Sequence, residues 1–114
     1  MIVHVFESAK SASQAAAAMF AAVVLRKPDA VLGLATGSTP IDTYRQLVKW
    51  HKDGMLDFSR ATTFNLDEYV GLGPDHPCGY RYFMQDNLFD HINMKETHVP
   101  DGLAPNLKAE ARRY

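Results

Sequence analysis

The chain has 114 residues, enough for one domain with a buried core, and its 46% apolar and 22% charged residues are ordinary for a globular protein. A net charge of −1, with basic residues scattered along the sequence, argues against a surface built for nucleic acid or for an anionic membrane. The single cysteine, Cys78, excludes an intrachain disulfide and favours a reducing compartment, so we expect a cytoplasmic protein.

The N-terminal third of the chain predicts a strand, a helix and a second strand. Residues Ile2 to Phe6 read as a short strand, and Ser8 is a suitable N-cap for a helix that runs to about Lys27. The apolar run within this helix, Ala15 to Leu25, has eleven residues, fewer than the ~20 that a membrane-spanning helix needs. Ala30 to Ala35 contains no polar residue, which predicts a central parallel strand covered on both faces.

The remaining residues continue the alternation of helices and strands. Thr39 is expected to be the N-cap of a helix with Pro40 in its first turn, and this helix ends near Asp53 and Gly54. Thr62 to Leu66 is the third predicted strand. A Pro- and Gly-rich loop, a helix, an edge strand and the start of another helix follow at 71–79, 80–89, 98–99 and 106–114.

This order of elements predicts an α/β fold with a doubly wound, mostly parallel, Rossmann-like sheet in one domain, residues 1–114. The last predicted helix stops at Tyr114 without a cap, so we expect the N-terminal portion of a longer α/β domain, incomplete at its C-terminus. Ligands of open parallel sheets bind at the carboxyl ends of the strands. The loops after the second and third predicted strands are therefore the first candidates for a site.

The segment from Thr36 to Pro40, TGSTP, has the makeup of an anion site between a strand and a helix. Backbone N–H groups and the helix dipole favour a negative charge there, and Ser38 and Thr39 add hydroxyl donors. The spacing is neither a Walker loop nor a dinucleotide fingerprint, and a tight turn with a good N-cap explains the residues equally well. Because a helix terminus contributes only ~0.3–2 kcal/mol toward an anion, a phosphate needs a cationic partner, for which Arg45 is a candidate.

Asp67 and Glu68 are adjacent carboxylates at the end of the third predicted strand. A partly buried carboxylate beside a like charge is a candidate general base, and a helix N-cap or a solvated turn is the alternative. Consecutive side chains point in different directions, so we expect only one of the two to face a substrate. Asn65, a polar residue within the strand, is a candidate for orienting Asp67, with a satisfied strand-end amide as its alternative.

Other reactive side chains are better explained without a catalytic role. Cys78 lies in a loop with no histidine at a recurring spacing, so a bystander is favoured over a nucleophile. The five histidines show no metal-ligand spacing, and we expect no metal site. Tyr80 and the neighbouring aromatic residues are interpreted as core or interface packing.

Together, the segments LGLATGSTP and TFNLDEYVGL resemble the glucosamine-6-phosphate deaminase family of sugar-phosphate isomerases and deaminases. YRQLVKWHKDG, YRYFMQDNLFDHI and NLKAEARRY support the resemblance, which thus covers essentially all of the chain. The sister family of 6-phosphogluconolactonases shares the Gly-Ser-Thr-Pro loop, but it typically has Asp-Glu-Arg and a following Val-Pro where this chain has DEYVGL. That difference favours the deaminase family.

The resemblance implies a reaction and a set of site residues. The family converts glucosamine 6-phosphate to fructose 6-phosphate and ammonia in amino-sugar catabolism, with no redox cofactor and no metal. At the matching position, Asp67 would move a proton between C2 and C1 of the open-chain sugar. The substrate-binding positions, including the phosphate site, would be Thr36, Gly37, Ser38, Thr39 and Glu68.

Two parts of the family pattern do not occur in these residues. One is the segment Asp-Gly-His-Ile-Ala-Phe-Asn-Glu-Pro, which serves ring opening and the amine, and the other is the basic residues that grip the phosphate. We therefore expect the chain to carry half of an active site and to release no ammonia by itself. The family also commonly has a serine before the helix at 80–89, where this chain has Cys78 and Gly79, so a weaker helix cap is expected.

Three other hypotheses stay open. They are a lactonase-like sugar-phosphate hydrolase, a sugar-phosphate-binding module without turnover, and an inactive fragment whose exposed sheet edge needs a partner. The sequence neither requires nor excludes a homo-oligomer.

Overall fold

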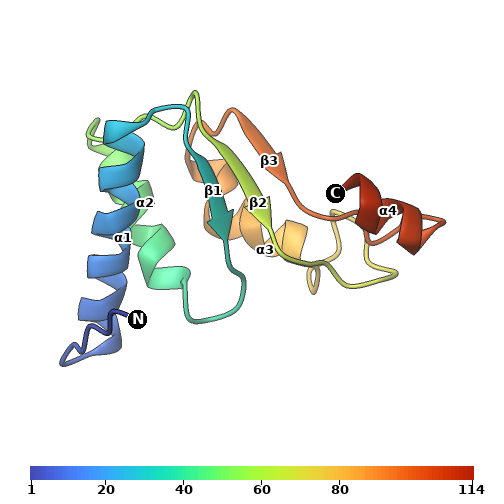
Figure 1. Cartoon of the computed structure of the whole chain (residues 1–114), viewed down its shortest axis with the longest axis horizontal. Coiled ribbons are helices and arrows are strands. Elements are labelled where there is room, and N and C mark those ends of the chain that lie inside the picture. Colours follow the sequence, from blue (N-terminus) through green and yellow to red (C-terminus); the bar gives the residue numbers. More distant parts are fainter.

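The computed structural model describes residues 1–114 as an α/β fold with one parallel sheet (Figure 1). In chain order its elements are α1 (Ala9–Arg26), β1 (Val31–Leu34), α2 (Ile41–Lys52), β2 (Thr62–Asn65), α3 (Tyr80–Asn87), a 3₁₀ turn η1 (Phe89–His91), β3 (Glu96–His98) and α4 (Leu107–Arg113). None of the helices is both long enough and apolar enough to cross a membrane.

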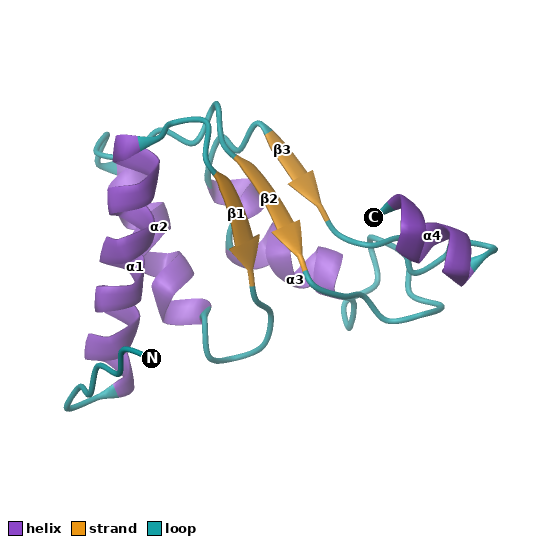
Figure 2. Cartoon of the chain, in the orientation of Figure 1, coloured by secondary structure: helices purple, strands orange, loops and turns teal.

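The three strands lie in the order β1-β2-β3 and all run in the same direction (Figure 2). β2 is central: Leu34 of β1 is in register with Asn65, and Phe64 is in register with His98 of β3. Because the strands are parallel, their carboxyl ends meet at one edge of the sheet. The predicted α/β fold with a parallel sheet is thus confirmed.

Side chains from β1, α2 and α3 form a common core on one face of the sheet. Leu32 of β1, Tyr44 and Leu47 of α2 and Met84 of α3 are all buried in one apolar cluster. Figure 1 shows α3 behind the sheet, with α1 and α2 packed together at the β1 side. Small buried side chains such as Ala17 on α1 allow close helix packing. Burial of each large apolar side chain stabilises the fold by about 1.5–3 kcal/mol.

The predicted strand at residues 2–6 is absent, whereas the predicted strand at residues 30–35 is present as β1 but lies at one end of the sheet and not at its centre. Residues 1–6 form no strand, and Ile2 and Val5 are 84% and 90% exposed. A strand needs a neighbouring strand to bond its N–H and C=O groups, and residues 1–6 pair with none of the three. β1 is also covered on one face only, because Val31 is 65% exposed whereas Leu32 is 6% exposed.

The helix boundaries follow the sequence with one change. The Ser8 side chain accepts a hydrogen bond from Ser11 N, 3.1 Å away, which confirms it as the N-cap of α1. The predicted N-cap of α2 was Thr39, but Pro40 occupies that position and no side chain caps the helix. The carbonyl of Ser38 instead accepts from Ile41 N, so a backbone turn closes the start of α2.

Candidate active site

The carboxyl ends of β1 and β2 are held together by a side chain as well as by the sheet. Asn65 Nδ2 donates a hydrogen bond of 3.0 Å to the carbonyl oxygen of Leu34, its register partner. The amide therefore links the two strand ends from which both candidate loops begin. Asn65 makes no hydrogen bond to Asp67, so the suggested direct orientation of Asp67 by this amide is absent.

The TGSTP loop presents free backbone donors in front of α2. The N–H groups of Gly37, Ser38 and Thr39 donate to no protein acceptor, and all three residues are exposed. Gly37 has a φ of +97°. A run of free N–H groups at a helix start is a suitable anion cradle.

The start of this loop is anchored to α2 by Tyr44. Its hydroxyl donates a short hydrogen bond to the carbonyl of Ala35, and the side chain is 2% exposed. Burial raises the pKa of Tyr44 to about 12, although the bond to Ala35 acts in the opposite direction. Tyr44 therefore donates this bond at every physiological pH.

Arg45, the candidate cationic partner, is engaged elsewhere. Its Nη1 lies 2.9 Å from Asp42 Oδ1, and both side chains are at least half exposed on α2. Exposed pairs of this kind contribute about 0–1 kcal/mol, so the pair does not commit Arg45 strongly to Asp42. The second arginine near this edge, Arg81 of α3, donates to Thr97 of β3, with Nη1 3.0 Å from Oγ1 and Nη2 3.4 Å from the carbonyl oxygen.

One hollow brings the two candidate loops together. It has a volume of about 190 Å³ and is lined by Thr36 of the first loop, by Asn65 and Asp67 at the end of β2, and by Tyr80 of α3, with Leu34, Ala35 and Leu66. Ser38 and Thr39 line a separate hollow of about 550 Å³ on the α1 side of the loop, and Gly37 lines neither hollow. Among the predicted site residues, the structure thus groups Thr36 with Asp67, and Ser38 with Thr39.

Tyr80 lines this hollow, although the sequence predicted only a packing role for it. Its hydroxyl lies 3.2 Å from that of Tyr69, and the two rings are 4.8 Å apart. The hydrogen bond with Tyr69 raises the pKa of Tyr80, and desolvation and the negative charge of Asp67 act in the same direction. The one sequence feature that could have indicated this place for Tyr80 is its position as the first residue of the helix after the Pro- and Gly-rich loop.

Glu68 is turned toward the protein. Its Oε1 accepts hydrogen bonds from Tyr69 N and Tyr80 N, at 2.8 and 2.9 Å, and its Oε2 accepts one from Arg81 N at 2.8 Å. Gly79, the N-cap of α3, has no side chain with which to cap the helix. The adjacent carboxylates therefore differ: Asp67 is exposed and lines the hollow, whereas Glu68 binds the first turn of α3.

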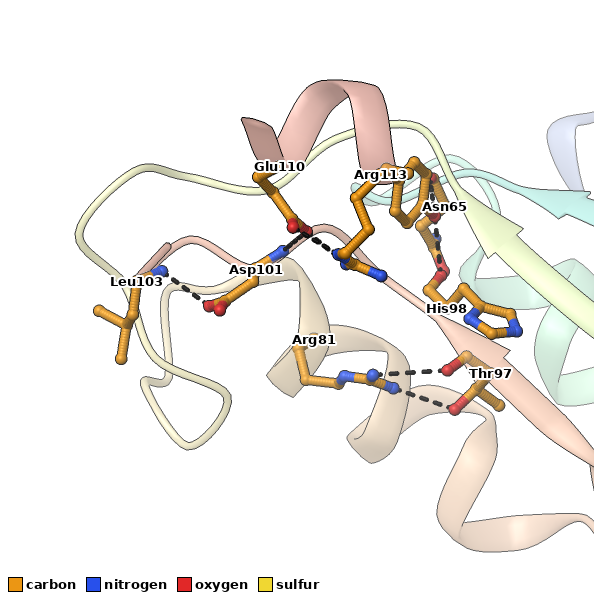
Figure 3. A network of polar contacts seen from close by, with 9 residues as sticks. Asn65, Arg81, Thr97, His98, Asp101, Leu103, Glu110 and Arg113 are labelled. Carbon is orange, nitrogen blue, oxygen red and sulfur yellow. Dashed lines mark hydrogen bonds and ion pairs between the residues drawn. The ribbon is translucent and has the colours of Figure 1, made fainter. Parts of the chain in front are cut away.

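Asp67 also borders a second hollow, of about 350 Å³, between the β2–α3 loop and α4. The wall on the α4 side is a polar network, drawn in Figure 3, in which Glu110 bonds Arg113, with Oε1 2.5 Å from Nη2, and accepts from Asp101 N at 2.9 Å. The hydrogen bond with Arg113 and the one from Asp101 lower the pKa of Glu110 to about 2. No cluster of three or more His, Cys, Asp or Glu side chains could hold a metal ion.

Curated relatives of the chain are glucosamine-6-phosphate deaminases, although the sequence matches no protein-family model. The deaminase of Lachnoclostridium phytofermentans is 55% identical over 104 residues, which make up 90% of this chain and 44% of that protein. The deaminase of Halothermothrix orenii is 48% identical over 116 residues, covering 100% of this chain and 48% of that protein. The chain thus spans a little under half the length of these relatives.

Solved structures give the same result. A monomeric glucosamine-6-phosphate deaminase, described as a missing link of the NagB superfamily, matches with a TM-score of 0.97 and 47% identity over 100% of this chain and 48% of its own. A 6-phosphogluconolactonase from Thermotoga maritima matches with a TM-score of 0.77 at 15% identity, over 99% of this chain and 51% of its own, a likeness of fold alone. By sequence and by fold, the chain is therefore homologous to glucosamine-6-phosphate deaminases and corresponds to roughly the first half of their length.

Proposed function

We propose that this chain supplies the proton-transfer base and the phosphate loop for the isomerising deamination of glucosamine 6-phosphate to fructose 6-phosphate and ammonia. One observation carries the proposal: Asp67, at the end of β2, shares a hollow with Thr36, at the start of the loop after β1. The two groups come from adjacent parallel strands whose ends are joined through Asn65. A phosphate on one loop could thus present the sugar carbons to the other.

In the proposed step the Asp67 carboxylate removes the proton from C2 of the open-chain amino sugar and delivers a proton to C1. The C2–H electron pair forms the C1–C2 double bond, and the C1 oxygen takes up the displaced electron pair. The C1 oxygen takes a proton from solvent to give an enolamine, and the nitrogen lone pair then forms a C2=N bond while the C1–C2 π pair takes up the proton at C1. Water adds to C2 of this iminium ion, and the resulting carbinolamine releases ammonia to leave the C2 ketone. A positioned general base accelerates such a transfer by about 10²–10⁴-fold, and the exposed position of Asp67 leaves its carboxylate accessible to a substrate.

The phosphate would bind the free N–H groups of Gly37, Ser38 and Thr39 and the hydroxyl groups of Ser38 and Thr39. These donors lie on the same short loop as Thr36. A hexose phosphate bound to them would therefore extend across this loop, from the hollow lined by Ser38 and Thr39 to the hollow lined by Thr36 and Asp67. The Asp67 hollow, at about 190 Å³, is below the ~300–1,000 Å³ of complete ligand sites. It would hold the reacting carbons and leave the rest of the sugar outside.

The cytoplasm is the proposed location, because the one cysteine is an exposed free thiol, which a reducing compartment preserves. A lactonase-like hydrolase is a weaker alternative, since its support is a likeness of fold at 15% identity. A binding module without turnover is the remaining alternative.

The test is exchange of the C2 proton of glucosamine 6-phosphate with deuterated water, followed by NMR together with ammonia release. We expect exchange with the wild-type protein and with Asp75→Asn, which alters an exposed aspartate of the adjacent loop. Asp67→Asn should slow exchange at least about 100-fold. Exchange that survives Asp67→Asn would remove Asp67 from the mechanism, and sugar-phosphate binding without exchange would favour the binding module. Ammonia release by the chain would show that these residues suffice for the complete reaction.

A further inference from the structure

We propose that Glu68 is a positioning residue for the reaction: by binding the first turn of α3, it holds Asp67 opposite Tyr80. This inference rests on the proposed function, but it also makes a prediction that needs no substrate. It gives Glu68 a role through other residues instead of through contact with the sugar.

The Glu68 carboxylate is engaged in hydrogen bonds within the protein. Both oxygens of Glu68 are used, and they accept hydrogen bonds from three backbone N–H groups, of Tyr69, Tyr80 and Arg81. Hydrogen bonds to an ionised carboxylate are short and strong, and all three are between 2.8 and 2.9 Å. A carboxylate so fully bonded has little capacity left for a substrate hydroxyl.

The hydrogen bonds of Glu68 connect the end of β2 to the start of α3. Glu68 follows Asp67 directly in the chain, and Tyr80 is the first residue of α3. Asp67, at the end of β2, and Tyr80, on α3, both line the same hollow. The Glu68 carboxylate is therefore the link that fixes the base relative to the phenol across from it.

Two glycines, Gly79 and Gly102, leave the space that this link occupies. A Cβ at Gly79 would lie 3.2 Å from the His76 carbonyl oxygen and 3.5 Å from Glu68 Oε2. A Cβ at Gly102 would lie 2.3 Å from the Tyr69 carbonyl oxygen and 3.2 Å from Glu68 Cγ. The backbone thus closes tightly around Glu68 from two segments, and Gly71 N also donates a 2.8 Å bond to the carbonyl of Gly102.

The competing explanation is that Glu68 only stabilises α3, and a local cap separates the two. Gly79 has the extended backbone of an N-cap, with φ −80° and ψ 153°, which a serine adopts readily. Glu68→Ala removes the link, and Glu68→Ala/Gly79→Ser adds a cap on α3 without restoring the link to Asp67. Gly79→Ser alone measures the effect of the tight contact with His76.

We expect Glu68→Ala to lower the melting temperature and Glu68→Ala/Gly79→Ser to recover most of that loss. C2-proton exchange should stay slowed by about 100-fold in both, because small displacements of a reacting group have effects of that size. Gly79→Ser alone should exchange at close to the wild-type rate. Wild-type exchange in the double variant would reduce Glu68 to a helix cap and overturn the inference.

The substrate-free readout is the pH titration of Tyr80 by NMR of labelled tyrosine. Because the Asp67 charge contributes to the raised pKa of Tyr80, Asp67→Asn should lower that pKa while Glu68 is present. In the Glu68→Ala/Gly79→Ser background, Asp67→Asn should leave the Tyr80 pKa unchanged, with exposed Tyr82 as the internal control. If the wild-type protein shows no exchange at all, the proposed function fails, and this titration still decides the role of Glu68. If Asp67→Asn still lowered the Tyr80 pKa in the absence of Glu68, the positioning role of Glu68 would be overturned.

Discussion

Asn65 and Leu34 are joined twice, as register partners of β2 and β1 and through the hydrogen bond of 3.0 Å from Asn65 Nδ2 to the Leu34 carbonyl oxygen. The bond to Leu34 fixes which way the amide faces, so the Oδ1 is the atom that stays buried without a partner. A buried polar side chain thus sets the spacing of the strand ends that lead to Thr36 and Asp67.

Asn65→Ala should lower the free energy of unfolding by about 1–3 kcal/mol, because the buried Leu34 carbonyl loses a donor and a small cavity is left. Urea denaturation monitored by circular dichroism measures the change. Asn87→Ala is the matched control, since Asn87 Nδ2 bonds only the Phe83 carbonyl within α3, and its effect should stay within about 0.5 kcal/mol. Equal losses in the free energy of unfolding for the two variants would mean that the hydrogen bond from Asn65 to Leu34 contributes no more than the bond from Asn87 within α3.

Thr63→Val should stabilise the protein by about 1 kcal/mol, because the Thr63 Oγ1 is buried without any hydrogen-bond partner. Valine keeps the β-branched shape that a strand favours. Thr62→Val, at a partly exposed neighbouring position on the same strand, is the control. The comparison is made by thermal unfolding, and a lower melting temperature for Thr63→Val would show that the hydroxyl has a partner in solution.

Tyr44→Phe should lower the free energy of unfolding by about 0.5–1.5 kcal/mol, the net contribution of one hydrogen bond. It should also weaken the binding of glucosamine 6-phosphate, since the Tyr44 hydroxyl fixes Ala35 at the start of the TGSTP loop. NMR titration with the sugar phosphate measures the second effect. Tyr82→Phe alters an exposed tyrosine and should change neither quantity. Stability lost without any change in affinity would separate Tyr44 from the loop.

Glu110 should make stability depend on pH in the acid range. Its pKa is lowered from 4.5 to about 2 in the folded protein, first by Arg113 and then by Asp101 N. The stabilisation is therefore fully present above pH 4.5 and is lost as the pH falls through about 2. Urea unfolding between pH 6 and pH 2 should show a shallower acid decline for Glu110→Gln than for wild type. Glu7→Gln, at an exposed position, should follow the wild-type curve.

Much of the fold could be predicted because it is encoded locally. The Ser8 cap, the apolar strand before TGSTP and the amphipathic helix with Tyr44 and Leu47 on one side are all patterns of a few residues. Residues 1–6 have the composition of a strand, but composition does not supply the neighbouring strand that pairing requires. The one-sided burial of β1 was missed for the same reason, since an apolar run does not reveal which of its faces is covered.

The site was only partly predictable, because its decisive contacts join distant residues. The position of Asp67 at a strand end followed from the sequence. The bond between Glu68 and Tyr80 N spans 12 residues, and the bond from the Tyr114 hydroxyl to the Asn65 carbonyl spans 49. No periodicity encodes such pairs. The sequence offered a helix cap as the alternative for the carboxylate pair, but the binding of Glu68 to the first turn of α3 and the place of Tyr80 beside Asp67 emerged only from the structure.

The missing side chain at Gly79 has a consequence for the order of folding. An isolated helix shorter than about 12–15 residues is marginal in water, and α3 has eight residues and no cap of its own. Its first turn gains its acceptor only when the β2–α3 segment closes and brings in Glu68. The closed β2–α3 segment and the first turn of α3 should therefore form as one cooperative unit. Hydrogen exchange of the Tyr80 and Arg81 amides should then report the same free energy of opening.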